Sequence, residues 1–439
     1  MNREDWNYLS INECAEVIGG GTPSTKNPNY WDGNIPWISP KDLSNNKDKY
    51  ISNGERFITQ VGLEKSSAKL LPVNSLLFSS RAPIGYLAIN TKPVATNQGF
   101  KSLILKEEFD VEFFYYLFKD KTEYIKNFAS GSTFQEVSGS VVKNLSFLIP
   151  PKQEQKRISN ILSKLDKKIE LNLKMNETLE DIAKTLFKSW FIDFDPVRAK
   201  AEGRPTGLSK EISDLFPDAF EVSQSGEIPK GWQVYNLESV FDFLEGPGIR
   251  NWQYTDEENG VNFINIRCIK NGDLDLSSAS KITEDEAYGK YSHFQLMPDD
   301  MVVSCSGTLG KFAFVRNSHI PLNLNTSVIR FRPKRELTNI NFLEGFIRTQ
   351  LQRELEIRAT GSAQRNFGPT HLKEIETIVP KKEIMNLFGE ILHPLLRKRI
   401  LNLDQNDILI GLRNTLLPKL ISGELKITDA ESLIEEAGI

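Results

Sequence analysis

Residues 158–190 read ISNILSKLDKKIELNLKMNETLEDIAKTLFKSW, and their apolar positions alternate spacings of four and three residues. This average spacing of 3.5 residues is the seam of a coiled coil, so the stretch predicts a long helix that pairs with another. Adding 230 to each seam position locates a second such stretch near the C-terminus. The residues expected to pair are Ile158, Leu162, Leu165, Ile169, Asn172, Asn176, Leu179 and Leu186 with Phe388, Leu392, Leu395, Asn402, Asn406, Leu409 and Leu416.

Two asparagines recur in register within the two stretches, Asn172 with Asn402 and Asn176 with Asn406. A buried polar residue in such a seam weakens pairing but fixes register and partner. The simplest arrangement is antiparallel, with Asn172 close to Asn402 near a pseudo-two-fold axis. A helix of about 35 residues is roughly 50 Å long and would form a rigid strut between two domains. The alternative is two ordinary surface helices.

The rest of the chain also contains an internal sequence repeat, at offsets of 226 to 230 residues. Ile35–Ser39 returns at 262–265, Leu71–Leu77 returns as Met297–Val303, and Leu145–Pro150 returns as Ile375–Pro380. Because these weak matches share one order and nearly one offset, they indicate a duplicated domain. Each copy combines short β-rich runs, predicted as strands, with one amphipathic helix. The strands are expected at 75–79, 100–105, 261–266 and 327–331, and the helices at 111–128 and 340–359.

The predicted fold class is therefore α+β, with two repeated globular domains separated by two long antiparallel coiled-coil helices in a pseudo-two-fold arrangement. A length of 439 residues agrees with more than one domain. The predicted boundaries are 1–150 for the first domain, 151–190 for the first helix, 191–230 for a linker, 231–380 for the second domain, 381–425 for the second helix and 426–439 for a tail.

Composition predicts a cytoplasmic protein but does not by itself suggest a nucleic-acid partner. The polar start is unlike a signal peptide, and no apolar run approaches the roughly 18 residues that span a bilayer. Cys14, Cys268 and Cys305 are odd in number and far apart, which is typical of a reducing compartment. The formal net charge of −4 means that DNA binding would need local basic surfaces or partners that contribute charge.

The segment after the first helix resembles the central region of type I restriction specificity subunits. The similarity lies in FKSWFIDFDPVRAK at 187–200, EGRP at 202–205 and GEIPKGW at 226–232. LLPKLISGE at 416–424 resembles the end of that family's C-terminal helix, and GGTPS at 20–24 with PWISPKD at 36–42 resembles one type of its first recognition domain.

This resemblance implies a division of labour. Two target recognition domains would each read one half of a bipartite site in double-stranded DNA, with the paired helices as a spacer. The helices would also dock two modification subunits that bind S-adenosylmethionine and methylate adenine, and restriction subunits that use ATP and Mg²⁺ would join them. The chain itself would hold no cofactor and catalyse no reaction. A duplicated protein suits two half-sites on a duplex.

DNA reading requires Arg, Lys, Asn, Gln, Ser and Thr on loops, because these side chains reach phosphates and base edges. The row of Arg348, Arg353 and Arg358 is predicted instead to be a solvated helix face. The candidate DNA contacts are Lys41, Ser80, Arg81, Asn97, Gln98, Thr133 and Gln135 in the first copy, and Ser306, Thr308, Lys311, Asn325, Gln364, Arg365 and Asn366 in the second.

Other chemistry is less well supported by the sequence. Residues 19–26 lack the Gly-Lys-Ser/Thr ending of a nucleotide-binding loop, and Asn27–Tyr30 lacks one proline of the methyltransferase Asn-Pro-Pro-Tyr element. The four histidines, which show no metal-ligand spacing, are expected in structural or surface roles. Two other functions stay open, namely a protein-interaction scaffold without DNA specificity and an enzyme whose site straddles the copies.

Overall fold

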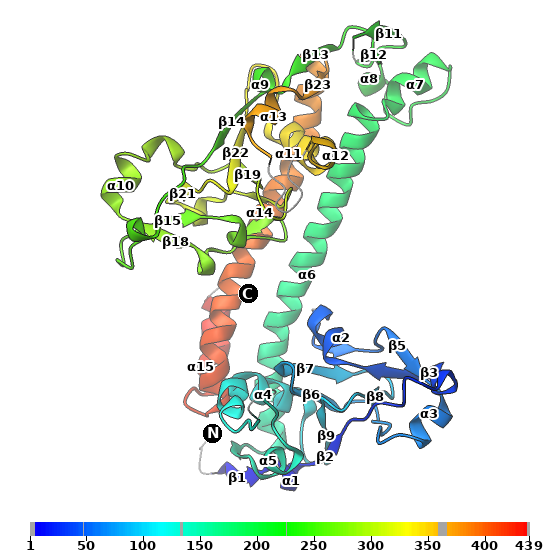
Figure 1. Cartoon of the computed structure of the whole chain (residues 1–439), viewed down its shortest axis with the longest axis vertical. Helices are drawn as coiled ribbons and strands as arrows, with labels where there is room; N and C mark the ends of the chain where they lie inside the picture. Colours follow the sequence, from blue (N-terminus) through cyan, green and yellow to red (C-terminus); the bar gives the residue numbers. More distant parts are fainter. Residues whose placement is uncertain (1–4, 47, 132–134, 225, 359–366, 437–439) are drawn as a thin grey trace. The chain divides into compact units, whose positions relative to one another are not determined.

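The computed structural model describes the whole chain except residues 1–4, 47, 132–134, 225, 359–366 and 437–439 (Figure 1). The chain folds as two compact units. Unit 1 comprises residues 1–171 and 406–439, and unit 2 comprises residues 172–405. Each unit therefore contains one repeat of the sequence together with parts of both long helices. No helix of the described residues is long and apolar enough to cross a membrane.

Unit 1 is built on two sheets, and helices pack on the larger one to form its main hydrophobic core. The five-stranded sheet has the order β2-β9-β6-β7-β4, and the three-stranded sheet has the order β5-β3-β8. Helix α4 (Val111–Lys126), which Asp110 caps by accepting from Phe113 N at 2.9 Å, packs against β7. The strands are β2 (Ala15–Gly19), β3 (Trp31–Ile38), β4 (Tyr50–Ile51), β5 (Arg56–Ile58), β6 (Leu76–Ser80), β7 (Ile84–Asn90), β8 (Ala95–Thr96) and β9 (Lys101–Leu105).

Unit 2 repeats this plan, with an isolated parallel bridge between Gly272 and Ala313 where unit 1 has β4. The four-stranded sheet has the order β14-β22-β19-β20 and the three-stranded sheet the order β18-β15-β21. In both three-stranded sheets the central strand is antiparallel to one neighbour and parallel to the other. The predicted duplication is thus confirmed. The strands are β14 (Phe241–Glu245), β15 (Val261–Ile264), β18 (Ser280–Ile282), β19 (Met301–Ser304), β20 (Phe312–Phe314), β21 (Leu322–Leu324) and β22 (Val328–Pro333).

A further pair of strands joins the start of each repeat to its end. In unit 1, β1 (Asn7–Ser10) pairs antiparallel with β10 (Ser146–Ile149). In unit 2, β13 (Gln233–Asn236) pairs in the same way with β23 (Glu376–Val379). Because a long helix follows each second strand, this pair brings the beginning of each repeat to the start of a long helix.

The predicted helix at 340–359 is wrong in one respect, because it is broken. Helix α11 (Ile340–Arg348) ends at Thr349, where the backbone leaves helical geometry at φ −125° and ψ −76°, and α12 (Gln350–Arg358) follows. The Thr349 hydroxyl donates to Gly345 O at 2.6 Å, which occupies a backbone acceptor of the last turn. No residue type at the bend itself indicates this break, since neither Gly nor Pro stands there.

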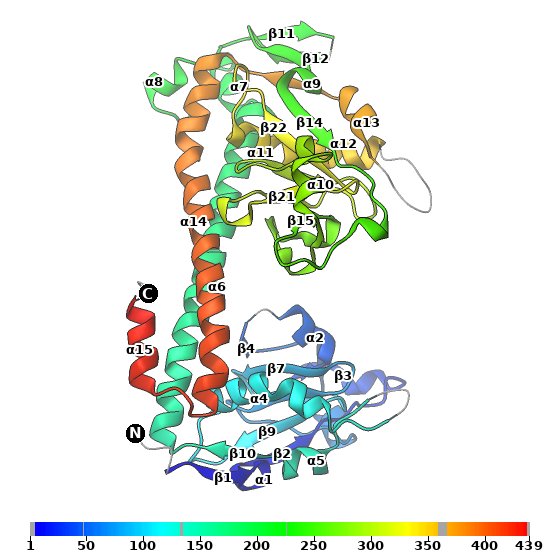
Figure 2. The same ribbon diagram turned by 90° about the vertical axis from the view of Figure 1, so that its left-hand side faces the viewer.

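The two long helices are α6 (Lys152–Phe191) and α14 (Lys382–Ile421), and each unit contains part of both. In unit 1, Arg413 pairs with Asp166 at 2.8 Å and Asn406 donates to Ile169 O at 3.4 Å. In unit 2, Asn172 donates to Gln405 at 2.9 Å. Within each unit the residue numbers rise along one helix as they fall along the other. The predicted antiparallel pairing is confirmed in both units (Figure 2).

The pairing of the asparagines differs by one helical turn from the prediction. Asn402 donates to Asn176 Oδ1 at 2.8 Å, and Asn176 donates to Arg399 O at 3.2 Å, whereas Asn172 bonds to Gln405. Adding the repeat offset locates residues in equivalent places, but equivalent residues of antiparallel helices do not have to face each other. All four seam asparagines are nevertheless buried, at 2–6% exposure.

Most of the expected seam residues are buried. Leu179, Leu186 and Leu395 are the exceptions and are half-buried. Leu396, beside Leu395, is buried instead and joins the unit 2 core. The buried seam residues are Ile158, Leu162, Leu165, Ile169, Asn172, Asn176, Phe388, Leu392, Asn402, Asn406, Leu409 and Leu416.

Buried ion pairs attach the sheet domain of unit 2 to its helices. Arg399 of α14 contacts Glu344 of α11 at 2.5 Å and Glu180 of α6 at 2.6 Å. Arg348 contacts the same two carboxylates at 2.9 and 3.0 Å. Arg348 is only 12% exposed, so its predicted place on a solvated helix face is wrong, whereas Arg353 is exposed. Burial raises the pKa of Glu344, but Arg399 and Arg348 outweigh it and hold that pKa below its usual range.

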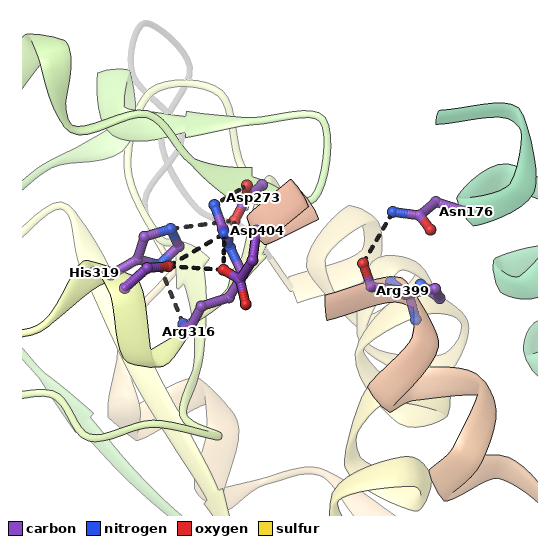
Figure 3. A network of polar contacts seen from close by, with 7 residues as sticks. Asn176, Asp273, Arg316, His319, Arg399 and Asp404 are labelled. Carbon is purple, nitrogen blue, oxygen red and sulfur yellow. Dashed lines mark hydrogen bonds and ion pairs between the residues drawn. The ribbon is translucent and has the colours of Figure 1, made fainter. Parts of the chain in front are cut away.

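A second polar network ties the same domain to α14 from another side (Figure 3). Arg316, which is 2% exposed, contacts Asp273 at 2.8 Å and also pairs with Asp404 of α14. His319 accepts from Arg316 N at 3.1 Å. Burial raises the pKa of Asp273 more than the neighbouring Arg316 lowers it. These contacts join the segment after β20 and strand β17 (Asp273–Leu274) to α14.

The segment predicted as a linker, 191–230, is largely folded. It forms α7 (Asp195–Ala201), α8 (Lys210–Ser213) and a hairpin of β11 (Phe220–Ser223) and β12 (Gly226–Pro229). Phe216 is buried against Trp190 with a ring separation of 4.9 Å. The predicted tail forms α15 (Ile427–Glu436), whose Ile427 and Ala430 are buried in the unit 1 core.

Candidate nucleic-acid interface

The candidate site of unit 1 is built around residues 97–99, the turn between β8 and β9, which we call turn 1. The Asn97 side-chain oxygen accepts from Gly99 N at 2.8 Å, and Asn97 O accepts from Phe100 N at 3.2 Å. Asn97 N donates to Ile38 O at 2.9 Å, which joins the turn to the end of β3. This Asx turn uses the asparagine side chain to replace a backbone acceptor.

The glycine-rich stretch before β3 packs directly on turn 1. Gly20 N donates to Phe100 O at 3.2 Å and Gly21 N donates to Thr96 O at 2.8 Å. A Cβ at position 20 would lie 1.8 Å from Asn97 O, so no residue with a side chain fits there without movement. The glycines thus serve a close approach of two backbones.

Charged and polar side chains surround turn 1. Gln98 is exposed and bonds to Thr22, while Arg81 contacts Glu136 at 3.4 Å. Lys101 contacts the same carboxylate at 2.8 Å. The Arg81 stem and the Pro40 ring would both contact a Cβ placed on Gly99, so the structure brings these two segments to the turn. Donors and acceptors of this kind can reach phosphates and base edges.

Unit 2 contains the same arrangement at residues 325–327, which we call turn 2. The Asn325 side-chain oxygen accepts from Ser327 N at 2.9 Å, and Asn325 O accepts from Val328 N at 3.0 Å. Asn325 N donates to Ile264 O at 3.1 Å, and Gly246 N donates to Val328 O at 3.3 Å. A Cβ on Gly246 would lie 2.5 Å from Asn325 O.

These matching hydrogen bonds align the two copies residue by residue. Asn97 corresponds to Asn325, Gly20 to Gly246 and Ile38 to Ile264. Ser80 N donates to Gly99 O at 2.7 Å as Cys305 N donates to Ser327 O at 3.0 Å. Hence Ser80 corresponds to Cys305, and the candidates Arg81 and Ser306 are equivalent. The two copies share one frame, while the side chains that project from it differ.

Comparison with known proteins agrees with this duplicated frame. The sequence profile of the type I restriction modification DNA specificity domain matches residues 3–181 and again 229–409. The chain belongs to this family. It is 33% identical to the MjaIX specificity subunit of a type I restriction enzyme from Methanocaldococcus jannaschii, over 97% of this chain and 95% of that protein.

Two other relatives extend the comparison. The HindI specificity subunit of Haemophilus influenzae is 26% identical, over 96% of this chain and all of that protein. The crystal structure of the type I restriction-modification S subunit from M. genitalium has the same fold, with a TM-score of 0.56, 17% identity, and 94% and 96% of the two chains covered. The predicted family membership is therefore confirmed over both repeats and the helices.

Within this specificity-subunit fold the predicted DNA contacts do not all lie at the surface. Ser80 is completely buried and its hydroxyl donates to Gly99 O at 3.2 Å, so it supports turn 1 and cannot meet a ligand without rearrangement. Asn97 and Asn325 are half-buried and use their side-chain oxygens within the turns. In these three positions a side-chain oxygen is engaged in the hydrogen bonds that build the turn.

The remaining candidates fall into three groups. Lys41, Gln98, Gln135, Thr308 and Lys311 are exposed, and Arg81 and Ser306 are half-buried. The Lys41 side chain is 69% exposed and contacts Glu55 at 2.9 Å, and this hydrogen bond raises the pKa of Lys41. Thr133, Gln364, Arg365 and Asn366 lie outside the described residues.

Three residues beside the turns are absent from the set predicted by sequence. Glu245 accepts from Thr326 of turn 2 at 3.4 Å, and burial raises the pKa of its carboxyl. Lys101 shares Glu136 with Arg81. Arg267 is exposed in the short helix that follows Ile264. Extending the sequence match between 35–39 and 262–265 by two residues would have aligned Arg267 with Lys41.

The histidines, which the sequence predicts in structural or surface roles, make contacts within the protein. His371 accepts from Gly368 N at 3.1 Å, and His393 accepts from Arg397 Nε at 3.3 Å. The His293 ring packs at a tilt against Phe294, with ring centroids 3.8 Å apart. Among the residues that the structure describes, no three His, Cys, Asp or Glu side chains gather where they could hold a metal ion. The three cysteines are buried and free.

Proposed function

We propose that this chain is the DNA-reading specificity subunit of a type I restriction-modification complex. Each unit reads one half of a bipartite site in double-stranded DNA, and the chain itself catalyses no reaction. The observation that carries the proposal is the Asx turn built twice, at Asn97 and at Asn325, on one frame with different projecting side chains. A backbone arrangement that is the same in both units, with different side chains projecting from it, suits two domains that bind the same DNA duplex and read different bases.

The partners follow from the same proposal. Two modification subunits bind S-adenosylmethionine and methylate adenine, and restriction subunits use ATP and Mg²⁺, so these cofactors belong to the partners. Such a complex acts on DNA in the cytoplasm, where the three free cysteines of this chain stay reduced. The partner subunits also contribute basic surface, which offsets the net charge of −4.

The long helices support the docking of these partners. Leu171 and Ile408 of unit 1 are 54% and 59% exposed, and Leu401 and Ile182 of unit 2 are 62% and 47% exposed. Large apolar side chains at such exposure are what a protein partner buries. Leu171 and Leu401 stand at equivalent places of the two repeats, as expected if two copies of one subunit bind.

The decisive experiment is genome-wide mapping of adenine methylation in the native host, with and without this chain. Loss of one bipartite motif is expected, with two short blocks separated by unspecified bases. Exchange of residues 1–150 for another recognition domain should change one block and leave the other. An unchanged methylome, together with no sequence-specific DNA binding by the chain with its modification subunits, would refute the proposal and favour a scaffold. Methyl transfer by the purified chain alone would favour an enzyme.

A further inference from the structure

Two cations occupy equivalent positions beside the two turns. Lys41 is the second residue of α2 (Pro40–Asn45), and Arg267 is the second residue of a short 3-10 helix, η4 (Ile266–Cys268). Both helices begin two residues after the isoleucine whose carbonyl binds the turn, Ile38 in unit 1 and Ile264 in unit 2. The backbone of each cation is therefore held at a fixed place relative to its turn.

Both cations are available to a ligand. Arg267 is exposed, and its guanidinium has no hydrogen bond or ion pair to any residue that the structure describes. Only its backbone is fixed, because Arg267 N donates to the Asn265 side chain at 2.9 Å. Lys41 has Glu55 as its partner, but both side chains of that pair are more than half exposed, at 69% and 59%. An ion pair so exposed contributes little and is readily exchanged for another anion.

The neighbouring positions change in chemical character between the copies, whereas this position keeps a positive charge, as Lys41 and Arg267. Arg81 of unit 1 is replaced by Ser306 in unit 2, and Gln98 of turn 1 is replaced by Thr326 of turn 2. A base-reading residue must vary with the half-site that it reads, but every duplex presents the same phosphates. A position that keeps a cation in both copies matches the part of DNA that does not vary.

We propose that Arg267, with its counterpart Lys41, anchors a DNA backbone phosphate and so positions the adjacent turn without reading sequence. This assignment rests on the proposed function. In unit 2 it leaves base discrimination to the side chains of turn 2 and its neighbours, among them Thr326. Loss of Arg267 should weaken binding equally for all sequences, and loss of a base-reading group should not.

The test measures binding of the chain with its modification subunits to fluorescein-labelled duplexes by anisotropy, between about 50 and 200 mM KCl. One duplex carries the intact site, and two others carry a changed base in one half-site each. The salt slope is the fall of log affinity with log salt concentration, and removing one phosphate contact should reduce it by about 0.9. Between the two salt concentrations the affinity of the unaltered chain should therefore fall about 3.5-fold more than that of Arg267→Ala. Arg267→Lys should keep the slope. Arg204→Ala, an exposed arginine in the segment between the first helix and the second repeat, should behave like the unaltered chain.

Thr326→Val provides the contrast. It should change the ratio of affinities between the duplexes and leave the salt slope as it is. An unchanged slope in Arg267→Ala would overturn the assignment, and so would a loss of affinity confined to one half-site sequence, since that would make Arg267 a base reader. If the unaltered chain binds all duplexes equally, the proposed function fails, and the assignment fails with it.

Discussion

Replacing Gly20 by alanine tests whether the close approach of two backbones positions turn 1. The new Cβ would lie 1.8 Å from Asn97 O, where contacts below 3.0 Å essentially do not occur. One backbone must therefore move by about 1.2 Å or more, a distance that breaks an optimal hydrogen bond of about 2.9 Å. The hydrogen bonds from Gly20 to Phe100 and from Gly21 to Thr96 depend on the same close approach.

The expected cost follows from this displacement. Overpacking of this kind destabilises a domain by about 1–3 kcal/mol, which unit 1 should survive. In DNA binding, a well-placed base contact is worth about 1–3 kcal/mol, so each one that the displacement breaks should lower affinity for the unit 1 half-site by about 5-fold to 150-fold. Discrimination at the unit 2 half-site should be unaffected.

The adjacent residue supplies a matched control. A Cβ on Gly19 would meet nothing within 4 Å, so Gly19→Ala makes the same chemical change without the clash. Binding is measured by anisotropy in the cold on duplexes changed in one half-site at a time, and folding by the melting temperature. In unit 2, Gly246→Ala against Gly248→Ala repeats the comparison, since a Cβ on Gly248 also meets nothing. If Gly20→Ala and Gly19→Ala bind the unit 1 half-site equally, turn 1 does not position DNA contacts.

Three further predictions concern the buried polar contacts of unit 2. Arg399→Met should destabilise the unit by about 1–3 kcal/mol in urea unfolding, because the 5%-exposed Glu344 loses one of its two arginine partners and keeps Arg348. The exposed Arg353→Ala should cost less than about 0.5 kcal/mol, and equal costs would contradict the buried network. Because Glu344 has a lowered pKa in the fold, its contribution to stability is complete above about pH 4.3 and is lost as the pH falls through the folded pKa. Between about pH 5 and 3 the melting temperature should therefore fall less steeply in Glu344→Gln than in the unaltered chain. An equal fall in both proteins would contradict a lowered pKa of Glu344 in the fold. Asn402→Leu should cost about 1–3 kcal/mol by stranding the Asn176 oxygen, and adding Asn176→Leu should recover most of it; additive losses in a double-mutant cycle would rule out their pairing.

The candidate site is predictable from the sequence only in part. Arg81, Asn97, Gln98 and Asn325 are polar residues expected on loops, and they do gather at or beside the two turns. Ser80 meets the same criterion but is buried, because a hydroxyl serves equally well as an internal hydrogen-bond donor. Arg267 escapes prediction because it stands two residues beyond the matched stretch, and composition alone does not distinguish it from any other surface arginine.

The sequence by itself determined the duplication, the α+β class of each copy and the two long helices. All three rest on patterns along the chain: the offset of 226 to 230 residues for the copies, the strand and helix patterns within each copy, and the 3.5-residue repeat for the seam. Such patterns can be read from the sequence whatever the three-dimensional packing. Only the tertiary structure decided which asparagines pair, that Arg348 contacts Glu344 and Glu180, and that Gly20 meets Asn97. These depend on which surfaces meet and at what angle, and contacts between residues far apart in sequence leave no periodic trace in the chain.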